Sequence, residues 1–202
     1  ERVTPLVVDG DGVYLDRYHR YQTDLAAELS VRVTAAPPNL DEALLCDGLA
    51  SLFGEGDEQQ RDAAEKALRQ RFSIIAGGPG TGKTAVVAKV LALLAQQAQA
   101  MSARTPRTLL LAPTGKAAQR LAESIAQTVD RWIPEALRNG IEREATTIHS
   151  ALGWIADTPR FRYHRDNPVA ADVVVIDEAS MVDLPLMAKL LDAVPPEARV
   201  VM

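Results

Sequence analysis

Apolar and polar positions along this chain change period several times, and each period predicts a type of element. Apolar residues three and four apart indicate helices, whereas short unbroken apolar runs indicate buried strands. From residue 58 onward the pattern predicts, in order, a helix at 58–70, a strand at 72–76, a helix at 82–97, a strand at 108–112, a helix through 117–125, a strand at 173–176, a helix at 184–193 and a strand from about 199. The run at 173–176 has four consecutive β-branched residues, which is typical of a parallel sheet covered on both faces. We therefore expect an α/β fold, a parallel sheet flanked by helices.

The N-terminal part follows a different pattern. Two short apolar runs flank Asp9-Gly10-Asp11-Gly12, which is a β-hairpin signal. Helical spacing begins at Asp16 and stops before Pro37-Pro38, and Asn39 with Glu42 resembles a capping box for a second helix. Residues 54–57 have the composition of a linker. We therefore expect an accessory segment of a hairpin and helices at 1–55 and an α/β lobe at 56–202.

Composition and charge narrow the function classes. Of 202 residues, 47% are hydrophobic and 24% are charged, which is ordinary for a folded globular protein. The net charge of −5 excludes a strongly basic coat for nucleic acid, but the charge is uneven: −7 over residues 1–70, +6 over 71–170 and −4 over 171–202. An anionic ligand in the middle of the chain fits this split, and ordinary surface variation explains it equally well.

The single cysteine, Cys46, rules out an internal disulfide and a cysteine-based metal site. It fits a reducing compartment, so we expect a cytoplasmic protein. No apolar run reaches the ~18–20 residues of a membrane span. The sequence begins at Glu1 rather than at a methionine and stops within a predicted strand. We therefore expect a piece of a longer protein, with an incomplete α/β lobe.

The segment Gly77-Gly78-Pro79-Gly80-Thr81-Gly82-Lys83-Thr84 fits the phosphate-binding pattern G-x-x-x-x-G-K-[ST]. It follows a predicted strand and opens a predicted helix, which is the context that the pattern requires. Glycines let successive N–H groups face an anion, and the helix N-terminus adds positive potential. The expected cradle comprises Gly77, Gly78, Gly80, Thr81 and Gly82. Lys83 is expected to reach the β- and γ-phosphates of ATP, and the Thr84 hydroxyl to bind Mg²⁺. A glycine-rich turn without function is the weak alternative.

Two carboxylates, Asp177 and Glu178, follow the strand predicted at 173–176. They lie at the carboxyl edge of the predicted sheet, where ligands of open α/β sheets bind. Asp177 can hold Mg²⁺, and Glu178 can orient and deprotonate an attacking water. The predicted catalytic residues are therefore Lys83, Asp177 and Glu178. The alternative, a solvated strand end with two acids, is weakened by the phosphate loop.

Gln60 stands at the start of the helix predicted at 58–70, ahead of the phosphate loop. Its amide offers both a donor and an acceptor, the pair that reads adenine. On the residues alone this role is weakly supported, because exposed glutamines are common and Gln59 competes with it.

Together these motifs resemble the superfamily 1 DNA helicases, and most closely the RecD family, the alpha subunits of exodeoxyribonuclease V (RecBCD). The resemblance rests on the phosphate loop and on the segments 112–121, 146–150 and 177–187. The run Asp-Glu-Ala-Ser-Met-Val-Asp-Leu-Pro-Leu-Met at 177–187 is far more specific than a generic Asp-Glu pair. Residues 5–11 and 162–168 are similar to the heterotrimer subunit as well. The resemblance extends from about residue 5 to residue 202 and implies a RecA-like P-loop NTPase lobe.

The resemblance also implies roles outside the phosphate site. It matches Gln60 to the adenine-contacting glutamine of these helicases. The residues that it places at single-stranded DNA are Pro113, Thr114, Lys116, Arg120, Thr147 and His149. Lys116 and Arg120 add positive charge for phosphates, although solvating a helix face is their alternative role. A lone histidine such as His149 is more often structural.

Residues 155–170 are basic and aromatic. In related helicases a hairpin near this position forms a small inserted subdomain that separates strands, and bases can stack on its aromatic faces. A β-hairpin packed on the sheet edge is the alternative. Tyr14, Tyr18 and Tyr21 can also stack nucleotides, but such a stripe is more often core or a subunit interface.

The resemblance implies the ATP-binding and hydrolysing lobe of a DNA helicase that moves 5′ to 3′ in double-strand break repair and recombination. The implied partners are single-stranded DNA, DNA ends and RecB- and RecC-type subunits, at the nucleoid in the cytoplasm. The chain alone is expected to bind nucleotide weakly and not to unwind DNA. Three alternatives stay open: a stand-alone RecD-like helicase, a non-motor P-loop ATPase switch, and a scaffold in which residues 1–53 dock on partner subunits.

Overall fold

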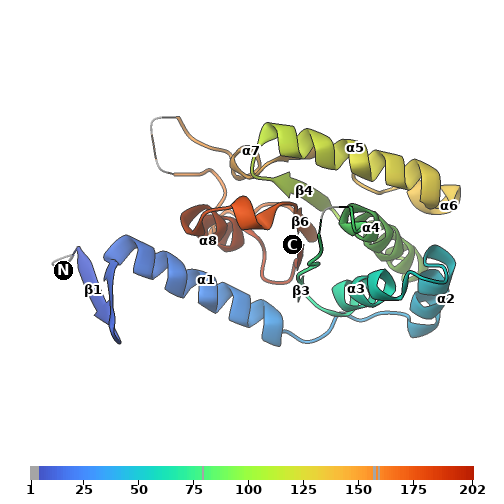
Figure 1. Cartoon of the computed structure of the whole chain (residues 1–202), viewed down its shortest axis with the longest axis horizontal. Coiled ribbons are helices and arrows are strands. Elements are labelled where there is room, and N and C mark those ends of the chain that lie inside the picture. The colour runs from blue at the N-terminus through green and yellow to red at the C-terminus, as the bar shows by residue number, and fades with distance from the viewer. Residues whose placement is uncertain (1–4, 79, 157, 159) are drawn as a thin grey trace.

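The computed structural model describes residues 5–78, 80–156, 158 and 160–202, and this part of the chain has an α/β fold (Figure 1). Its main sheet has five parallel strands in the order β3-β7-β6-β4-β5. Their bounds are β3 Phe72–Ser73, β4 Thr108–Ala112, β5 Ala145–Thr147, β6 Val173–Ile176 and β7 Arg199–Val201. The predicted parallel sheet flanked by helices is therefore confirmed.

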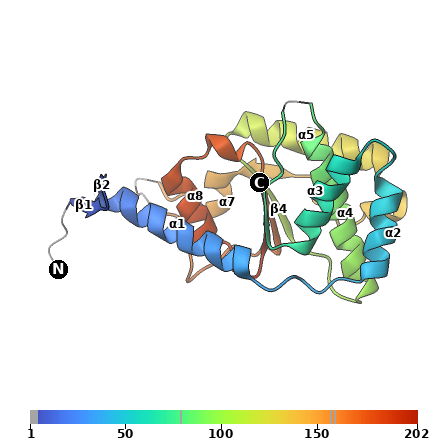
Figure 2. The same cartoon turned by 60° about the horizontal axis from the view of Figure 1, so that its bottom comes forward.

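Helices cover both faces of the sheet (Figure 2). Successive strand residues point to opposite sides, so each face of the sheet contributes to its own core. Val173 and Val175 of β6 belong to one core, and Val174 and Ile176 belong to another. The first core is completed by α2 (Glu42–Leu52), α3 (Glu58–Arg69), α4 (Lys83–Ala100) and α5 (Gly115–Trp132), beside the short α6 (Glu135–Arg138). The second contains α7 (Ile148–Leu152) and α8 (Leu184–Ala193). The unbroken β-branched run of β6 is thus buried on both sides, as predicted.

The N-terminal hairpin and the first long helix lie on the side of the second core. β1 (Leu6–Asp9) pairs antiparallel with β2 (Gly12–Leu15), and this hairpin projects away from the sheet (Figure 1). α1 (Asp16–Thr34) packs along α8. The buried guanidinium of Arg32 donates to the carbonyl oxygens of Leu191 (3.2 Å) and Val194 (2.7 Å). Since the last carbonyls of a helix lack partners within it, Arg32 caps α8 and fastens α1 to it.

α2 joins the accessory segment to the sheet. The Asp41 carboxylate accepts a hydrogen bond from the Leu44 N–H at 3.0 Å and caps the helix. The predicted capping box of Asn39 and Glu42 is therefore wrong, because Asp41 takes the cap and Glu42 pairs instead with Arg69 of α3 at 2.8 Å. Leucines of α2 are buried in the first core, so residues 42–52 pack with the α/β lobe. The division of the chain near residue 55 stays a prediction.

Two other differences from the sequence pattern concern short elements. The strand predicted at 72–76 is a strand only over Phe72–Ser73, although the Ile75 N–H still donates to the Met202 carbonyl at 2.7 Å. β5 and α7 were not predicted, because three and five residues are too few to establish a period.

None of the described helices combines the length and the apolar character that crossing a lipid bilayer requires.

Candidate functional site

The glycine-rich segment forms the turn between β3 and α4. Gly80 and Gly82 have φ of +75° and +82°, in the left-handed region that favours glycine. Gly82 is the N-cap of α4, so the loop ends on the N-terminus of a well-buried helix. A Cβ on Gly77 would lie 2.6 Å from the Thr81 hydroxyl oxygen, so a side chain there would displace the hydroxyl that donates to the Gly78 carbonyl. The local sequence therefore produces the tight anion-facing turn that the pattern predicts.

Lys83 lies folded over this loop. Its ammonium Nζ donates to the carbonyl oxygens of Gly77 at 2.6 Å and Gly78 at 2.9 Å. The Thr81 hydroxyl also donates to the Gly78 carbonyl, at 2.9 Å. The loop thus holds the Lys83 ammonium against its own carbonyl oxygens, beside the space that an anion would enter.

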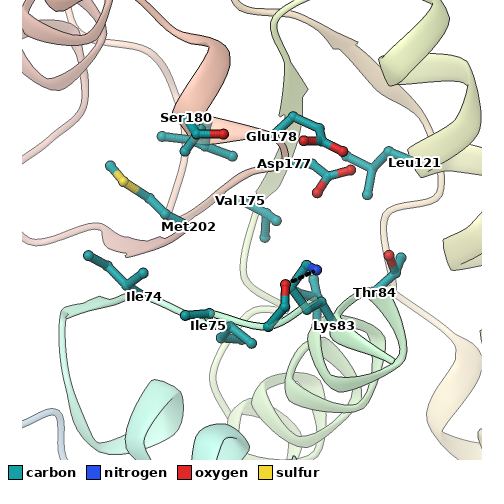
Figure 3. A pocket seen from close by; sticks show the side chains of 15 residues that line it. Ile74, Ile75, Lys83, Thr84, Leu121, Val175, Asp177, Glu178, Ser180 and Met202 are labelled. Carbon is teal, nitrogen blue, oxygen red and sulfur yellow. Dashed lines mark hydrogen bonds between the residues drawn. The ribbon is translucent and has the colours of Figure 1, made fainter. Parts of the chain in front are cut away.

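A cavity of about 500 Å³ opens beside the loop, between the ends of β3 and β6. Figure 3 shows Thr84 and Asp177 reaching into it from opposite sides, with Glu178 next to Asp177. Lys83 also lines this cavity. The structure therefore brings together the four predicted residues of the chemical step: Lys83, Thr84, Asp177 and Glu178.

The backbone around the two acids is specialised. The Asp177 N–H donates to the Leu111 carbonyl of β4 at 2.9 Å, which extends the parallel pairing by one residue. Glu178 has φ +52° and ψ +39°, a left-handed conformation that costs energy in a non-glycine residue. It opens the 3₁₀ turn Ala179–Met181. This bend turns the chain away from the sheet directly after the acids and leaves Glu178 exposed at the cavity.

The donors in this cavity fit a phosphate ester with a magnesium ion. Magnesium prefers oxygen ligands and is usually held by one or two carboxylates together with substrate phosphates. Thr84 supplies a hydroxyl and Asp177 a carboxylate of that kind. Among the described residues, no cluster of three or more His, Cys, Asp or Glu side chains could hold a metal by itself. The arrangement suits a metal that arrives with its nucleotide.

Gln60 reaches the phosphate loop from its other side, outside this cavity. Its Nε2 donates to the Thr81 carbonyl at 3.4 Å, and a Cβ on Gly82 would lie 3.1 Å from that nitrogen. Gln60 is half-buried against the loop, whereas Gln59 is exposed. The turn of α3 thus distinguishes two adjacent glutamines that the sequence could not separate.

The sheet fixes the position of α3 through Arg199 at the start of β7. This buried guanidinium donates to the carbonyl oxygens of Ala67 (2.6 Å), Leu68 (2.8 Å) and Gln70 (2.5 Å) at the end of α3. Burial lowers the pKa of Arg199 to about 10, which leaves it charged at neutral pH. Sequence reasoning missed this residue, since an arginine at a strand start gives no signal of burial.

Lys89 fastens the start of α3 to α4. Its Nζ lies 4.2 Å from the centre of the Phe53 ring and 3.8 Å from a carboxylate oxygen of Asp57, the N-cap of α3. Both ends of the helix that carries Gln60 are therefore held, one by α4 and the other by β7.

The residues predicted to meet DNA lie along the same edge of the sheet. β4 and β5 are parallel neighbours with Ala112 opposite Thr147, so Thr147 ends β5 and Thr114 lies two residues beyond the end of β4. Each threonine caps a helix: Thr114 accepts from the Ala117 N–H at 3.2 Å, and Thr147 from the Ser150 N–H at 3.1 Å. These hydroxyls already have a structural role.

Lys116 and Arg120 are exposed and lie one turn apart near the start of α5. Among the described residues, no carboxylate forms an ion pair with either of them. Pro113 is half-buried in the turn before them, and His149 is exposed, with its ring centre 5.8 Å from that of Phe161. The edge thus presents two cations and a ring to solvent next to the phosphate site.

Sequence reasoning did not assign Ser180 or Leu121 to the cavity wall. Ser180 follows the acid pair and lines the cavity with them. Leu121 of α5 closes another side of it, directly after Arg120 in the sequence. Proximity to Glu178 in the sequence was a signal for Ser180, whereas Leu121 gave the pattern of a core residue and no more.

The segment expected to form a hairpin at 155–170 is paired at two points. Trp154 bridges Phe161, and His164 bridges Asn167, both antiparallel. Arg165 then ties its second arm to Asp192 of α8 at 3.0 Å and to Glu28 of α1 at 2.5 Å. Asp157 and Pro159 lie outside the described residues.

Comparison with known proteins agrees with this geometry. Residues 60–202 match the family model described as an AAA domain. The chain is 44% identical over 194 residues to the RecBCD enzyme subunit RecD of Mycolicibacterium smegmatis, covering 96% of this chain and 34% of that protein. It is 42% identical over 162 residues to the Haemophilus influenzae RecBCD enzyme subunit RecD, covering 76% and 25% of the two. It is 32% identical over 196 residues to the ATP-dependent RecD2 DNA helicase of Deinococcus radiodurans, covering 96% and 24%. The chain spans about a third of the length of the first of these relatives and about a quarter of the other two.

Proposed function

The chain belongs to the AAA domain family and is RecD-like, and on that premise we propose that it is the ATP-binding and ATP-hydrolysing lobe of a DNA helicase. ATP and Mg²⁺ are the proposed cofactors. Lys83, Asp177 and Glu178 are the proposed catalytic residues, and Thr84 and Asp177 the proposed magnesium ligands. The proposed nucleotide cradle is the loop residues Gly77, Gly78, Gly80, Thr81 and Gly82, with Gln60 at the base.

Each residue has a distinct chemical task in this proposal. Lys83 leaves the loop carbonyls and places its positive charge on phosphate oxygens, where negative charge develops during hydrolysis. Glu178 orients a water molecule and accepts its proton, which its exposure at the cavity allows. Bound ATP supplies the phosphoryl group that is transferred to that water. Gln60 provides an amide donor and acceptor for the adenine edge.

One observation carries the link between ATP and DNA. Helix α5 has Lys116 and Arg120 on its exposed side, and its next residue, Leu121, lines the nucleotide cavity. A strand of DNA bound by Lys116 and Arg120 would therefore contact the same helix, α5, that forms one wall of the cavity. We expect single-stranded DNA to change ATP hydrolysis through this shared helix.

The proposal predicts ATP hydrolysis that single-stranded DNA stimulates. The protein expressed from its complete reading frame is assayed with and without a poly-thymidine oligonucleotide. Stimulation that Lys83→Ala abolishes supports a helicase lobe. Hydrolysis at the same rate with and without DNA supports a non-motor ATPase instead and overturns the proposal.

We further propose that the accessory segment, residues 1–55, docks on partner subunits, whereas residues 56–202 form the ATPase lobe. The relatives that share most of this chain are named as subunits of the RecBCD enzyme, which supports a complex with RecB- and RecC-type subunits acting at DNA ends in break repair. Val8 and Val13, on the projecting hairpin, are 73% and 66% exposed, which fits a contact surface. Movement from 5′ to 3′, a cytoplasmic location at the nucleoid and strand separation near 155–170 belong to the same proposal.

A stand-alone helicase is the second candidate, supported by the similarity to the Deinococcus radiodurans RecD2 helicase. Co-purification from the native host separates the two. RecB- and RecC-type partners held by the complete protein, and lost when residues 1–55 are removed, support the subunit role. Purification as a single active polypeptide supports the stand-alone form.

A further inference from the structure

Trp154 is a large aromatic side chain exposed to solvent at the base of the second hairpin, the one in which Trp154 pairs with Phe161. It is 59% exposed, although the whole chain has only two tryptophans. It lines a cavity of about 500 Å³ together with His149, Ser150 and Gly153. An exposed indole beside an open cavity offers a flat apolar face on which a planar ligand can lie.

The backbone holds this tryptophan firmly. The backbone N–H of Trp154 donates to the His149 carbonyl at 3.1 Å, and the preceding Gly153 ends α7 with φ +67°. The Arg162 N–H donates to the Gly153 carbonyl at 2.9 Å, which binds the two arms of the hairpin together. A Cβ on Gly153 would lie 2.9 Å from the Arg162 Cβ, so only glycine lets the arms approach this closely. The indole therefore stands on a rigid base.

Its surroundings are those of the proposed DNA edge. Thr147 caps α7 and His149 lies in its first turn, so the helix leads directly from the end of β5 to Trp154. Phe161, opposite Trp154 in the hairpin, contacts the His149 ring. Arg160 and Arg162 flank Phe161, and no carboxylate among the described residues forms an ion pair with either. Aromatic faces and cations together are the chemistry that binds single-stranded nucleic acid.

We propose that Trp154 is a base-stacking residue, and that one unpaired base of single-stranded DNA lies on its indole next to His149. The phosphates on either side would then meet Arg160 or Arg162. This inference rests on the proposed function, since it requires DNA along the edge that holds Thr147 and His149. It adds a specific residue, directly before the basic and aromatic segment 155–170, to the proposed DNA contacts.

Trp132 provides a matched control. It is 58% exposed and is the last residue of α5, about 25 Å along the helix axis from Lys116 near the start of that helix. Its ring lies 4.8 Å from the Arg131 guanidinium carbon, so it also has a cationic neighbour. Trp132→Phe leaves Trp154 as the only indole, and Trp154→Phe leaves Trp132.

The experiment titrates both single-tryptophan variants of the chain with poly-thymidine, and follows DNA binding independently by the anisotropy of a labelled oligonucleotide. We expect binding to quench the emission of Trp154 and to leave that of Trp132 unchanged. Trp154→Ala should weaken binding on the order of tenfold, and Trp132→Ala less than twofold. An oligonucleotide of abasic sites should bind wild type and Trp154→Ala equally.

The outcomes separate this inference from the proposed function. DNA binding with unquenched Trp154 and an unchanged affinity in Trp154→Ala overturns the stacking role and leaves the helicase proposal standing. If the wild-type chain binds no DNA, the stacking role falls, whereas the helicase proposal is judged by DNA-stimulated ATP hydrolysis in the protein from the complete reading frame. Circular dichroism of each variant, together with unchanged ATP affinity in Trp154→Ala, shows that the fold and the nucleotide site are intact.

Discussion

The Lys83 ammonium donates to the carbonyl oxygen of Gly77 at 2.6 Å, so the cation of the phosphate loop is held by the loop itself. A second acceptor, the Gly78 carbonyl, lies 2.9 Å away. Both carbonyls are exposed to water, which makes these bonds weak relative to a contact with phosphate oxygens. The lysine is thus retained near the loop and can be released to an incoming anion.

Replacing this lysine should abolish tight nucleotide binding without unfolding the protein. Lys83→Ala removes a charge-assisted contact worth about 2 kcal/mol, which corresponds to about thirtyfold in Kd. The affinity for a fluorescent ATP analogue measures the effect. Lys66→Ala is the control, because Lys66 is exposed and its ion-pair partner in the described part of the chain is Asp62 on its own helix. Equal losses in the two variants would refute a specific role for Lys83.

Gln60 should select the base rather than the phosphates. In Gln60→Ala we expect the affinity for ATP to fall about fivefold, the loss of roughly one neutral hydrogen bond, whereas GTP affinity should not change. Gln59→Ala should leave both affinities as they are, since that side chain is exposed and the hydrogen bond to the loop comes from Gln60. Competition of ATP and GTP for the same fluorescent analogue tests this. A parallel loss of ATP and GTP binding would mean that Gln60 only supports the loop.

Arg199 should contribute strongly to stability. Arg199→Met leaves the carbonyls of Ala67, Leu68 and Gln70 without their donor in a buried place, at a cost of about 3 kcal/mol in the free energy of unfolding. Urea denaturation followed by circular dichroism measures that cost. Arg71→Met, which removes an exposed donor to the Glu197 carbonyl, should cost less than about 1 kcal/mol. Similar midpoints for wild type and Arg199→Met would contradict this account.

The acid stability of the fold should depend in part on Asp172. Two bonds from Arg104, at 2.5 and 2.6 Å, lower the pKa of this carboxyl below its ordinary value of 3.8, and the Arg107 N–H lowers it further. The folded state therefore binds this proton less readily than the unfolded state does, so stability rises with pH across that window. The contribution is complete above about pH 5 and is lost as pH falls through the folded pKa.

Asp172→Asn should accordingly be less stable than wild type at pH 6, and the difference should shrink as the pH is lowered from about 4 to 2. Arg104→Met should flatten the same part of the curve, since it removes the main cause of the shift. Thermal melting at a series of pH values tests both. A stability difference that stays constant between pH 6 and pH 2 would rule out the ion pair as its origin.

Lys116 should bind DNA through phosphate charge alone. Lys116→Ala should weaken binding to all sequences alike and reduce the slope of log K against log salt by about one. Arg131→Ala, at the other end of α5, should leave the slope unchanged. Anisotropy titrations at several salt concentrations give both values. A loss of affinity with an unaltered slope would indicate a packing role for Lys116.

Features that depend on neighbours along the chain could be predicted from the amino-acid sequence. Glycines at 80 and 82 permit a positive φ whatever surrounds them, and the apolar run of β6 demands cover on both faces. The α/β class, the phosphate loop and the acid pair at a strand end follow from such local requirements. The short elements β5 and α7 could not be predicted, because three to five residues do not establish a hydrophobic period.

Tertiary structure alone decided the relationships between distant residues. The strand order places Thr84 across the cavity from Asp177, and the phase of α3 sends Gln60 rather than Gln59 to the loop. Arg199 is buried against the end of α3, and Trp154 stays 59% exposed although it pairs with Phe161. Burial and contact are properties of the packed chain, and no local pattern in the sequence contains them.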